Sequence, residues 1–436
     1  MTELSPAKAG LLRTIIEGSP DHALARLEQL LGDPSVRYGA LGAVWSLISH
    51  ESRDRRDRDA VLEPVQGLFG AELPKPLRTA LWKHLKINHP GPVQEAARAA
   101  SAWDPQEVDV APYDRLCVVA AEDLRADPPA EMLAAWSSDL REQLAGALDL
   151  APIVRRCLPH LGDWLARMDQ ERRAMARLAY RDCVAIRPDA GPLFFRMLSG
   201  RLAEPWHVLR IVSAVMDRPT ERYMASSELS VFGLETLDQV EALLAQVRSF
   251  DPSGGPASAR LAGAAVRRAC EALSELEDAV QLARDGDWGQ RATRAKRGLA
   301  DAVEERLKAI DKALGQALPM QSIRYSARLI KAAPKLSADP DPAAVTRMMS
   351  LLTFAEEVRS TADFGGFGST RARVLEAVDK VVDPYVEEVL DHLRSDGVPE
   401  EEAVRSRAYL EIAADLMALA KDERSGQIVR RRLAAA

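Results

Sequence analysis

Residues 5–34 read SPAKAGLLRTIIEGSPDHALARLEQLLGDP, and this stretch sets the pattern of the N-terminal half of the chain. Its three prolines, Pro6, Pro20 and Pro34, recur at one spacing, and each follows a Ser or Asp, residue types that cap helices. Between the prolines lie segments rich in Ala, Leu and Arg with helical periodicity. The stretch therefore predicts short helices that begin at the prolines, each capped by the residue before its proline.

Proline-bearing breaks recur about every helix length as far as Pro219, and almost nothing between them has the pattern of a strand. Antiparallel pairs of short helices stacked side by side would give an array like those of HEAT or armadillo proteins. No consensus repeat superposes on itself, so an irregular globular helical domain stays open. We predict an irregular helical-hairpin (HEAT/armadillo-like) array over residues 1–218.

The texture of the sequence changes after about residue 225. Apolar residues then alternate steps of three and four along longer segments, as in residues 303–314, and short turns rich in Gly, Pro and Asp separate these segments. Turns this short bring the chain back on itself. We predict an antiparallel long-helix bundle over residues 219–318.

Residues 319–436 have the pattern of a second, smaller helical bundle. Gly- and Pro-containing breaks divide this part into three periodic segments. We expect helices at about 343–361, 370–394 and 400–421.

The composition supports the all-α class. Hydrophobic residues make up 47% of the 436 residues and aromatic residues only 5%, which suits closely packed helices better than broad sheet faces. The net charge is −7 with both signs interspersed, so nucleic-acid binding is not expected. No apolar run reaches about 18 residues, and the first residues lack the pattern of a secretory leader. We expect a cytoplasmic protein without a membrane segment, and the excess of Arg over Lys is compatible with a GC-rich bacterial genome.

The four cysteines, Cys117, Cys157, Cys183 and Cys270, lie far apart in the sequence. None has the spacing of a zinc or redox motif, and their neighbours are small or apolar. We expect four buried, inert thiols in a reducing compartment, and we expect no metal and no cofactor.

The strongest local signal is the glycine-rich segment 365–370. Its glycines would let a ligand approach the backbone, and Ser369 or Thr370 could cap the following helix and leave amides for an anion. No lysine of a phosphate-binding loop and no preceding strand accompany the segment. The alternative is a helix connection with two phenylalanines tucked into the bundle. The candidate contacts for an anion or a partner are Gly365, Gly366, Gly368, Ser369, Thr370, Arg371 and Arg373.

A second candidate is a basic and aromatic patch near residue 85. In a nucleic-acid binder such a helix end could contact phosphates and stack on a base. The same residues would also make an ordinary helix C-terminus, and the two histidines lack the spacing for a shared metal. The patch consists of Trp82, Lys83, His84, Lys86 and His89.

Three further features have mainly structural interpretations. Most tryptophans fall in the N-terminal half, where they are expected to pack between helices, with a tryptophan-lined peptide groove as the alternative. Residues 51–59 alternate in charge, which predicts a solvated loop or helix face, with a docking patch as the alternative. The end, residues 430–436, is three arginines followed by Leu and Ala, and it resembles a bacterial degradation tag or a frayed helix end.

No catalytic signature stands out in the sequence. The preferred hypothesis is a non-enzymatic cytoplasmic helical scaffold or adaptor that mediates protein–protein interaction. One alternative is an all-α small-ligand receptor or enzyme with its site between the N-terminal array and the bundle. Another is a nucleic-acid binder with an Arg-rich concave face.

Overall fold

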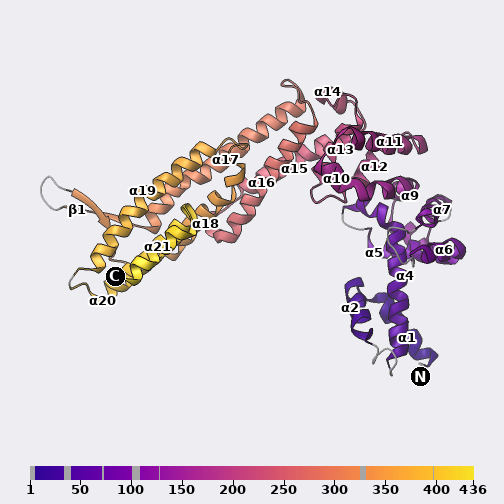
Figure 1. The fold of residues 1–436 in the computed structure, drawn as a ribbon, viewed down its shortest axis with the longest axis horizontal. Helices are drawn as coiled ribbons and strands as arrows, with labels where there is room; N and C mark the ends of the chain where they lie inside the picture. The colour runs from indigo at the N-terminus through magenta and orange to yellow at the C-terminus, as the bar shows by residue number, and fades with distance from the viewer. Residues whose placement is uncertain are drawn as a thin grey trace. The chain divides into compact units, whose positions relative to one another are not determined.

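The computed structural model describes residues 5–33, 41–70, 73–100, 109–126, 128–324, 330–395 and 397–436. The described part of the chain is all-α apart from one short hairpin (Figure 1). It divides into two compact units, an N-terminal unit, Met1–Asp217, and a C-terminal unit, Arg218–Ala436. Within the described ranges, no helix combines the length and the apolar composition needed to cross a bilayer.

The helices of the N-terminal unit are mostly short, as the proline breaks predict. Its α-helices are α1 (Pro6–Gly18), α2 (Asp21–Leu31), α4 (Gly42–Gln66), α5 (Lys75–Asn88), α6 (Pro90–Ala100), α7 (Ala111–Ala126), α8 (Ala130–Ala135), α9 (Ser138–Cys157), α10 (Leu161–Ala166), α11 (Gln170–Ile186), α12 (Ala190–Ser199) and α13 (Val208–Val215). Its 3₁₀ turns are η1 (Gly67–Phe69), η2 (Leu158–His160) and η3 (Pro205–His207).

The long helix α4 organises this unit. It packs against α1 and α2, and also against α6, α7, α9 and α12, which come much later in the sequence. At the end of α4 the chain approaches α12 so closely that a Cβ on Gly67 would lie 2.1 Å from the Met197 carbonyl oxygen. In a simple solenoid each hairpin contacts only its neighbours. The all-α prediction is confirmed, whereas the contacts of α4 do not confirm the solenoid arrangement.

The predicted capping pattern is wrong in part. Ser5 precedes α1 but its side chain makes no cap, and the Ser19 hydroxyl donates to the Ile15 carbonyl instead of capping α2. Pro34, the third predicted start, lies outside the described residues. Pro6 stands in the first turn of α1, where its fixed φ suits the helix and its missing N–H costs nothing, whereas Pro20 is the residue before α2, which begins at Asp21.

The C-terminal unit contains the long helices. Its α-helices are α14 (Glu221–Ala225), α15 (Ser230–Arg248), α16 (Gly255–Ala279), α17 (Asp287–Ala317), α18 (Pro342–Glu357), α19 (Gly368–Leu393), α20 (Glu400–Ala420) and α21 (Glu423–Ala434). Its 3₁₀ turns are η4 (Pro252–Gly254) and η5 (Arg359–Thr361), and its strands are β1 (Met320–Arg324) and β2 (Ile330–Pro334).

The helices α15, α16 and α17 lie where the three-and-four spacing predicts long helices. Helix α15 packs against both of the others, and α18 packs against α16 and α17. One hydrophobic core runs from Leu243 on α15 to Val429 on α21. The prediction places a boundary between residues 318 and 319, and in the structure the helices on both sides of that position share this core.

A buried carboxylate closes the turn before α17. Glu221 is 4% exposed, and its carboxylate oxygens accept hydrogen bonds from the backbone N–H groups of Ala283 (2.8 Å), Trp288 (2.8 Å) and Gly289 (3.2 Å). The N-terminus of a helix has free N–H groups and a positive end of the dipole, so a carboxylate is stable there. Glu221 thereby fixes the connection between α16 and α17.

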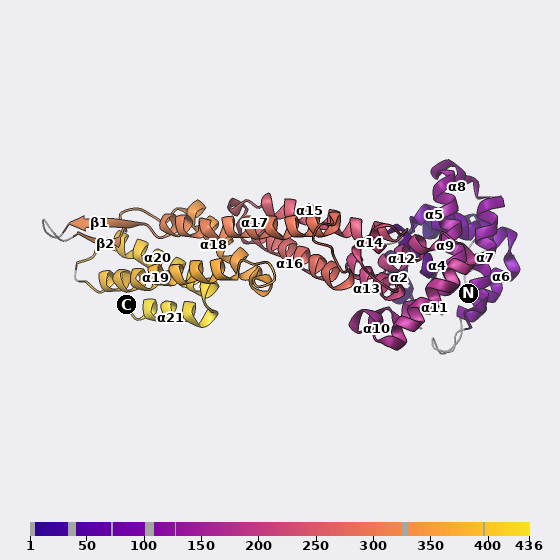
Figure 2. The ribbon, with the colours of Figure 1, turned by 90° about the horizontal axis from the view of Figure 1, so that it is seen from above.

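The β-hairpin and α21 are absent from the sequence-based expectations. Strands β1 and β2 pair antiparallel with Met320 opposite Pro334 and Arg324 opposite Ile330. Figure 2 shows the hairpin at one end of the C-terminal unit, beyond α19 and α20. Helix α21 packs along α20, and Arg432 pairs there with Glu387 of α19 through two contacts of 2.5 and 2.6 Å.

Candidate functional site

The glycine-rich segment 365–370 is the connection into α19. Gly366 has a φ of +78°, a conformation that glycine adopts without strain. Phe367 is fully buried, and Phe364 packs on the core with the Lys296 ammonium 3.9 Å from its ring centroid. These contacts support the alternative of a helix connection with both phenylalanines tucked into the bundle.

The polar side chains of this segment contact groups of the chain itself. The buried Thr370 hydroxyl donates to the Glu304 carboxylate at 3.0 Å. Arg371 donates to the Ala355 carbonyl at 2.7 Å and to the Glu356 carboxylate at 2.9 Å. Ser369 is exposed and makes no cap.

The predicted anion contact at this segment is therefore not assembled. Arg373 reaches the Thr370 hydroxyl at 3.5 Å, where Glu304 already accepts a hydrogen bond. Lys308 and Thr370 hold the pKa of Glu304 below its usual value, so a negative charge already stands where the anion would sit. Gly365 and Gly368 serve close packing: a Cβ on Gly365 would lie 2.2 Å from the Phe367 ring.

Two residues of the basic and aromatic patch, Trp82 and Lys86, contact Asp54 of α4. Trp82 is 3% exposed and donates from Nε1 to Asp54 at 3.0 Å, so its ring cannot stack on a base. Lys86 pairs with the same carboxylate at 2.7 Å, whereas Lys83 is exposed. The burial of this ring gives the nucleic-acid interpretation of the patch no support.

The two histidines of the patch lie at a single carboxylate. His84 Nε2 and His89 Nε2 lie 3.0 and 2.8 Å from Asp123 Oδ2 of α7. The pair joins the end of α5 and the start of α6 to α7. Among the described residues, no group of three or more His, Cys, Asp or Glu side chains is arranged to hold a metal ion.

The prediction of a solvated loop or helix face for residues 51–59 holds for Arg53 and Arg56, which are exposed, and is wrong for the charged residues that are buried. They lie on α4, where Arg55 and Arg58 are 6% and 3% exposed. Arg55 donates to the carbonyls of Ile16, Glu17 and Ser19 at 2.8 to 3.0 Å, and so binds the end of α1. Because α4 is a helix, some of the charged side chains in this segment point into the unit and others point to solvent. A buried arginine is stable where its N–H groups donate to carbonyls that lack other partners.

The four cysteines are free and buried, as the sequence predicts. Burial raises the pKa of Cys117 and of Cys157 to about 12 and that of Cys270 to about 11, and it raises the pKa of Cys183 as well. A thiol with so high a pKa is a poor nucleophile.

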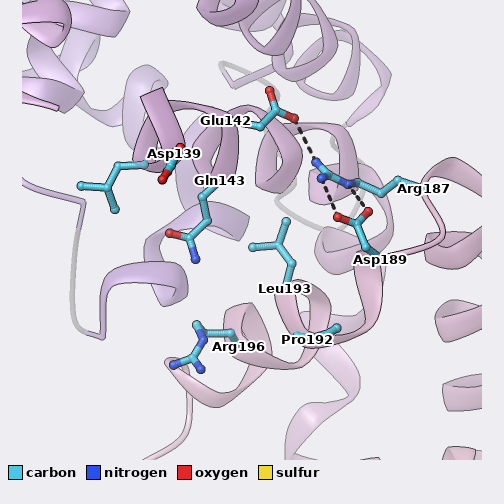
Figure 3. Close-up of a pocket in the computed structure, with 9 residues that line it drawn as sticks. Asp139, Glu142, Gln143, Arg187, Asp189, Pro192, Leu193 and Arg196 are labelled. Atoms are coloured by element: carbon cyan, nitrogen blue, oxygen red, sulfur yellow. Dashed lines mark hydrogen bonds and ion pairs between the residues drawn. The ribbon is translucent and has the colours of Figure 1, made fainter. Parts of the chain in front are cut away.

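An open groove of about 520 Å³ lies between the first half of α9 and α12 (Figure 3), and we call it the α9–α12 groove. Figure 3 shows Gln143 of α9 and Leu193 of α12 pointing toward one another across it. Leu193 is half-buried and Leu140 is 41% exposed, and with Pro192 they are the apolar residues of a lining that is otherwise polar. The lining side chains are Asp139, Leu140, Glu142, Gln143, Arg187, Asp189, Pro192, Leu193 and Arg196.

Local sequence features fix both walls of this groove. The Ser137 hydroxyl accepts a hydrogen bond from the Leu140 N–H at 3.3 Å and so starts α9 at this point. Gly146 lets the Arg187 side chain lie across α9, since a Cβ there would be 2.1 Å from Arg187 Nη1. Pro188 separates α11 from α12 and presents Asp189 beside Arg187.

Ion pairs hold the charged end of the groove in place. Arg187 contacts Asp189 through two hydrogen bonds of 2.9 and 3.0 Å, and it contacts Glu142 at 3.3 Å. On the other side, Arg125 donates to Glu142 at 3.0 Å and to Asp149 at 2.6 Å. Arg125 first, and Arg187 second, hold the pKa of Glu142 below its usual value, and Arg187 does the same for Asp189. Both carboxylates therefore stay ionised at neutral pH.

The chemistry of the lining favours binding over bond cleavage. The nine side chains include no hydroxyl, thiol or imidazole. A general acid needs a proton near neutral pH, and the arginines keep Glu142 and Asp189 from holding one. The groove offers three apolar side chains, one amide and charges of both signs.

A second groove, of about 720 Å³, lies between α4, α7 and α9, and we call it the α4–α9 groove. Its most buried charged side chain is Arg155, which is 8% exposed. Arg155 donates to the carbonyls of Ala60 (2.7 Å) and Val61 (2.8 Å) and to Asp114 (3.1 Å). The lining side chains are Ala60, Glu63, Val110, Tyr113, Arg155, Leu158, Pro159, Leu161 and Arg201.

A proline inside α4 explains why Arg155 is buried there. Pro64 lies within the helix and has no N–H, so the Ala60 carbonyl four residues earlier lacks its helical donor. The Arg155 guanidinium supplies the missing hydrogen bond from α9. Because its donors are used in this way, Arg155 ties the fold together and is a weak candidate for binding a ligand.

Sequence reasoning missed both grooves. Their linings come from segments between residues 60 and 201 that carry no motif. The available signals were indirect: Pro64 inside a helical segment implies a carbonyl in need of a donor, and Arg187-Pro188-Asp189 implies a tight helix connection.

Comparisons of the chain with protein-family models, with curated proteins and with solved structures gave no match.

Proposed function

We propose that this chain is a non-enzymatic helical interaction protein that binds a segment of a partner protein in the α9–α12 groove. The observation that carries the proposal is the construction of that groove: apolar side chains from two helices beside charges that ion pairs hold in place. Grooves between helices commonly bind peptide segments through apolar anchors, and the flanking charges set register and orientation.

The charges suggest the chemistry of the bound segment. Arg187 is paired with Glu142 and Asp189, and Asp139 on α9 and Arg196 on α12 lie at the opposite end of the groove (Figure 3). The proposed ligand is a segment with an apolar residue that packs on Leu140 and Leu193 and with polar residues that face the charged lining. The four buried free thiols fit a reducing compartment such as a bacterial cytoplasm.

The nucleic-acid alternative receives little support. The N-terminal unit has slightly fewer Lys and Arg than Asp and Glu, and the arginines Arg55, Arg58, Arg78 and Arg155 are buried in it. A nucleic-acid interface needs exposed basic side chains on one face.

The experiment is selection of 12-residue peptides displayed on phage against the purified chain, followed by fluorescence anisotropy with the selected peptides. Leu140→Glu replaces an apolar lining residue with a charge, and Leu178→Glu is the matched control, because Leu178 is 56% exposed on α11 and does not line the groove. A buried apolar anchor contributes about 1.5–3 kcal/mol, so Leu140→Glu should weaken binding by about 10-fold or more.

Two results decide the proposal. Loss of binding in Leu140→Glu with unchanged binding in Leu178→Glu supports it. Equal affinities for the two variants, or no selected peptide above background, would refute it.

A further inference from the structure

The hydrogen-bond alternation of the β-hairpin determines which backbone groups face outward. The Lys335 N–H donates to the Pro319 carbonyl at 2.9 Å, so residues 319 and 335 form a hydrogen-bonded pair. The register continues regularly from Met320–Pro334 to Arg324–Ile330, and hydrogen-bonded pairs alternate with non-bonded ones. The N–H and C=O groups of Met320, Ser322 and Arg324 therefore point away from β2, along the open edge of β1.

The two edges of this hairpin differ. On β2 the outward position Pro334 is buried, has no N–H, and its carbonyl accepts a hydrogen bond from the Gln321 side chain at 3.3 Å. Strand β2 also packs against α19. Strand β1 has no such cover: Gln321 and Ser322 are exposed, and Met320 and Ile323 are 43% and 36% exposed.

An open edge of this kind is a template for another strand. Proteins protect edges with proline, bulges, charged side chains or covering elements, and β1 has no proline and no bulge, with one charged residue, Arg324, at its end. Packing of β2 against α19 supports the hairpin from one side only. The edge of β1 therefore has free hydrogen-bonding groups with which another strand can pair.

We propose that β1 pairs with β1 of a second copy of this chain, antiparallel about a two-fold axis at Ser322. In that register the outward groups of Met320 face those of Arg324 in the second copy, and Ser322 faces Ser322. Three outward residues centred on one position are self-complementary, so all of them find partners in the same arrangement. The product is a four-stranded antiparallel sheet. This inference is independent of the α9–α12 groove.

The predicted association is weak. A pairing limited to short edge strands buries little area, less than the roughly 1,200 Å² of a stable interface. We therefore expect a dimer that dissociates on dilution, which sedimentation velocity can follow across a concentration series. The mass should fall from twice 47.7 kDa toward 47.7 kDa as the chain is diluted.

Two proline substitutions test whether the β1 edge forms the dimer contact. Ser322→Pro removes an N–H that points outward, so the hairpin keeps its own hydrogen bonds while the edge loses the centre of the pairing. Ala332→Pro is the matched control, since Ala332 lies opposite Ser322 and its N–H points outward on the β2 edge. Ser322→Pro should weaken the dimer by about 10-fold or more, because two hydrogen bonds at the two-fold axis are lost. Ala332→Pro should leave it unchanged.

A cysteine substitution tests the register. In the proposed pairing the two Ser322 Cα atoms lie about 5.5 Å apart, within reach of a disulfide. The four native thiols are buried, so Ser322→Cys introduces an accessible one. Mild oxidation should crosslink Ser322→Cys into a covalent dimer and leave Ala332→Cys monomeric.

A chain that stays monomeric up to about 0.5 mM, well above the range expected for a weak specific contact, would overturn the proposal. So would a dimer that Ser322→Pro and Ala332→Pro affect equally, because the contact would then lie elsewhere. Crosslinking of Ala332→Cys as readily as Ser322→Cys would contradict the register.

Discussion

The hydrogen bonds from Arg155 across to α4 give the most direct test of how the N-terminal unit is held together. Arg155→Met keeps much of the side-chain volume and removes the hydrogen bonds to the Ala60 and Val61 carbonyls and to Asp114. Hydrogen bonds from a charged group contribute about 1.5–3 kcal/mol each, and breaking a buried charged contact costs about 3–5 kcal/mol. Ala60 lines the open α4–α9 groove, where water can replace part of the loss. We expect the free energy of unfolding to fall by about 2–4 kcal/mol.

The dependence on Pro64 separates this explanation from a general packing effect. In Pro64→Ala the new N–H satisfies the Ala60 carbonyl, so the carbonyl no longer depends on Arg155. Arg155→Met should then cost about 1 kcal/mol less in the Pro64→Ala background than in the wild-type background. A double-mutant cycle measures this coupling directly.

Urea unfolding followed by tryptophan fluorescence suits the measurement, because Trp82, Trp164 and Trp206 are buried in the N-terminal unit. Arg156→Met is the matched control: Arg156 is the next residue of α9, its side chain is 63% exposed, and it pairs with the exposed Asp182 at 3.3 Å. The control should change the free energy of unfolding by less than about 0.5 kcal/mol. Additive effects of Arg155→Met and Pro64→Ala, within about 0.5 kcal/mol, would refute the role assigned to Arg155.

Two further predictions concern buried carboxylates. Glu221→Ala leaves three backbone N–H groups without their acceptor. It should destabilise the C-terminal unit by about 2–4 kcal/mol and remove hydrogen-exchange protection from residues 283–289. Glu400→Ala, at an exposed position, is the control, and unchanged protection in Glu221→Ala would contradict the capping role. Burial, with a smaller contribution from Asp54, raises the pKa of Asp57 to about 6, so the folded chain binds a proton there that the unfolded chain has released. The stability contributed by the protonated Asp57 carboxyl is therefore lost as pH rises from about 4 to about 6. At pH 7, Asp57→Asn should be more stable than the wild type by about 1–2 kcal/mol, and this difference should vanish near pH 4. Urea unfolding at the two pH values checks this, and a pH-independent difference would contradict it.

Sequence patterns located the helices of the C-terminal unit closely. The predicted helices at about 370–394 and 400–421 are observed at Gly368–Leu393 and Glu400–Ala420. Long periodic segments between Gly- and Pro-rich turns have one favourable local structure, so local information is enough. The hairpin was missed because residues 320–334 have weak alternation, and its pairing is a contact between segments rather than a local preference.

The candidate site residues were chosen by residue type, and in the structure several of them bond to groups of the same chain. Trp82, Thr370 and Arg371 are residue types that often bind ligands, yet their partners here are Asp54, Glu304 and the Ala355 carbonyl. Whether a polar side chain is free or satisfied depends on what tertiary packing brings beside it, which the order of residues along one segment does not reveal.

By itself, the sequence determined the all-α class, the division into short and long helices and the inert state of the four cysteines. These properties follow from periodicity, proline positions and the apolar surroundings of each thiol, all of which are local. Only the tertiary structure decided that Arg55 and Arg155 are buried, that α9 and α12 enclose a groove, and that β1 presents an open edge. Each of these depends on contacts between distant segments, where the need to satisfy buried carbonyls and charges selects one arrangement among many that the local patterns allow.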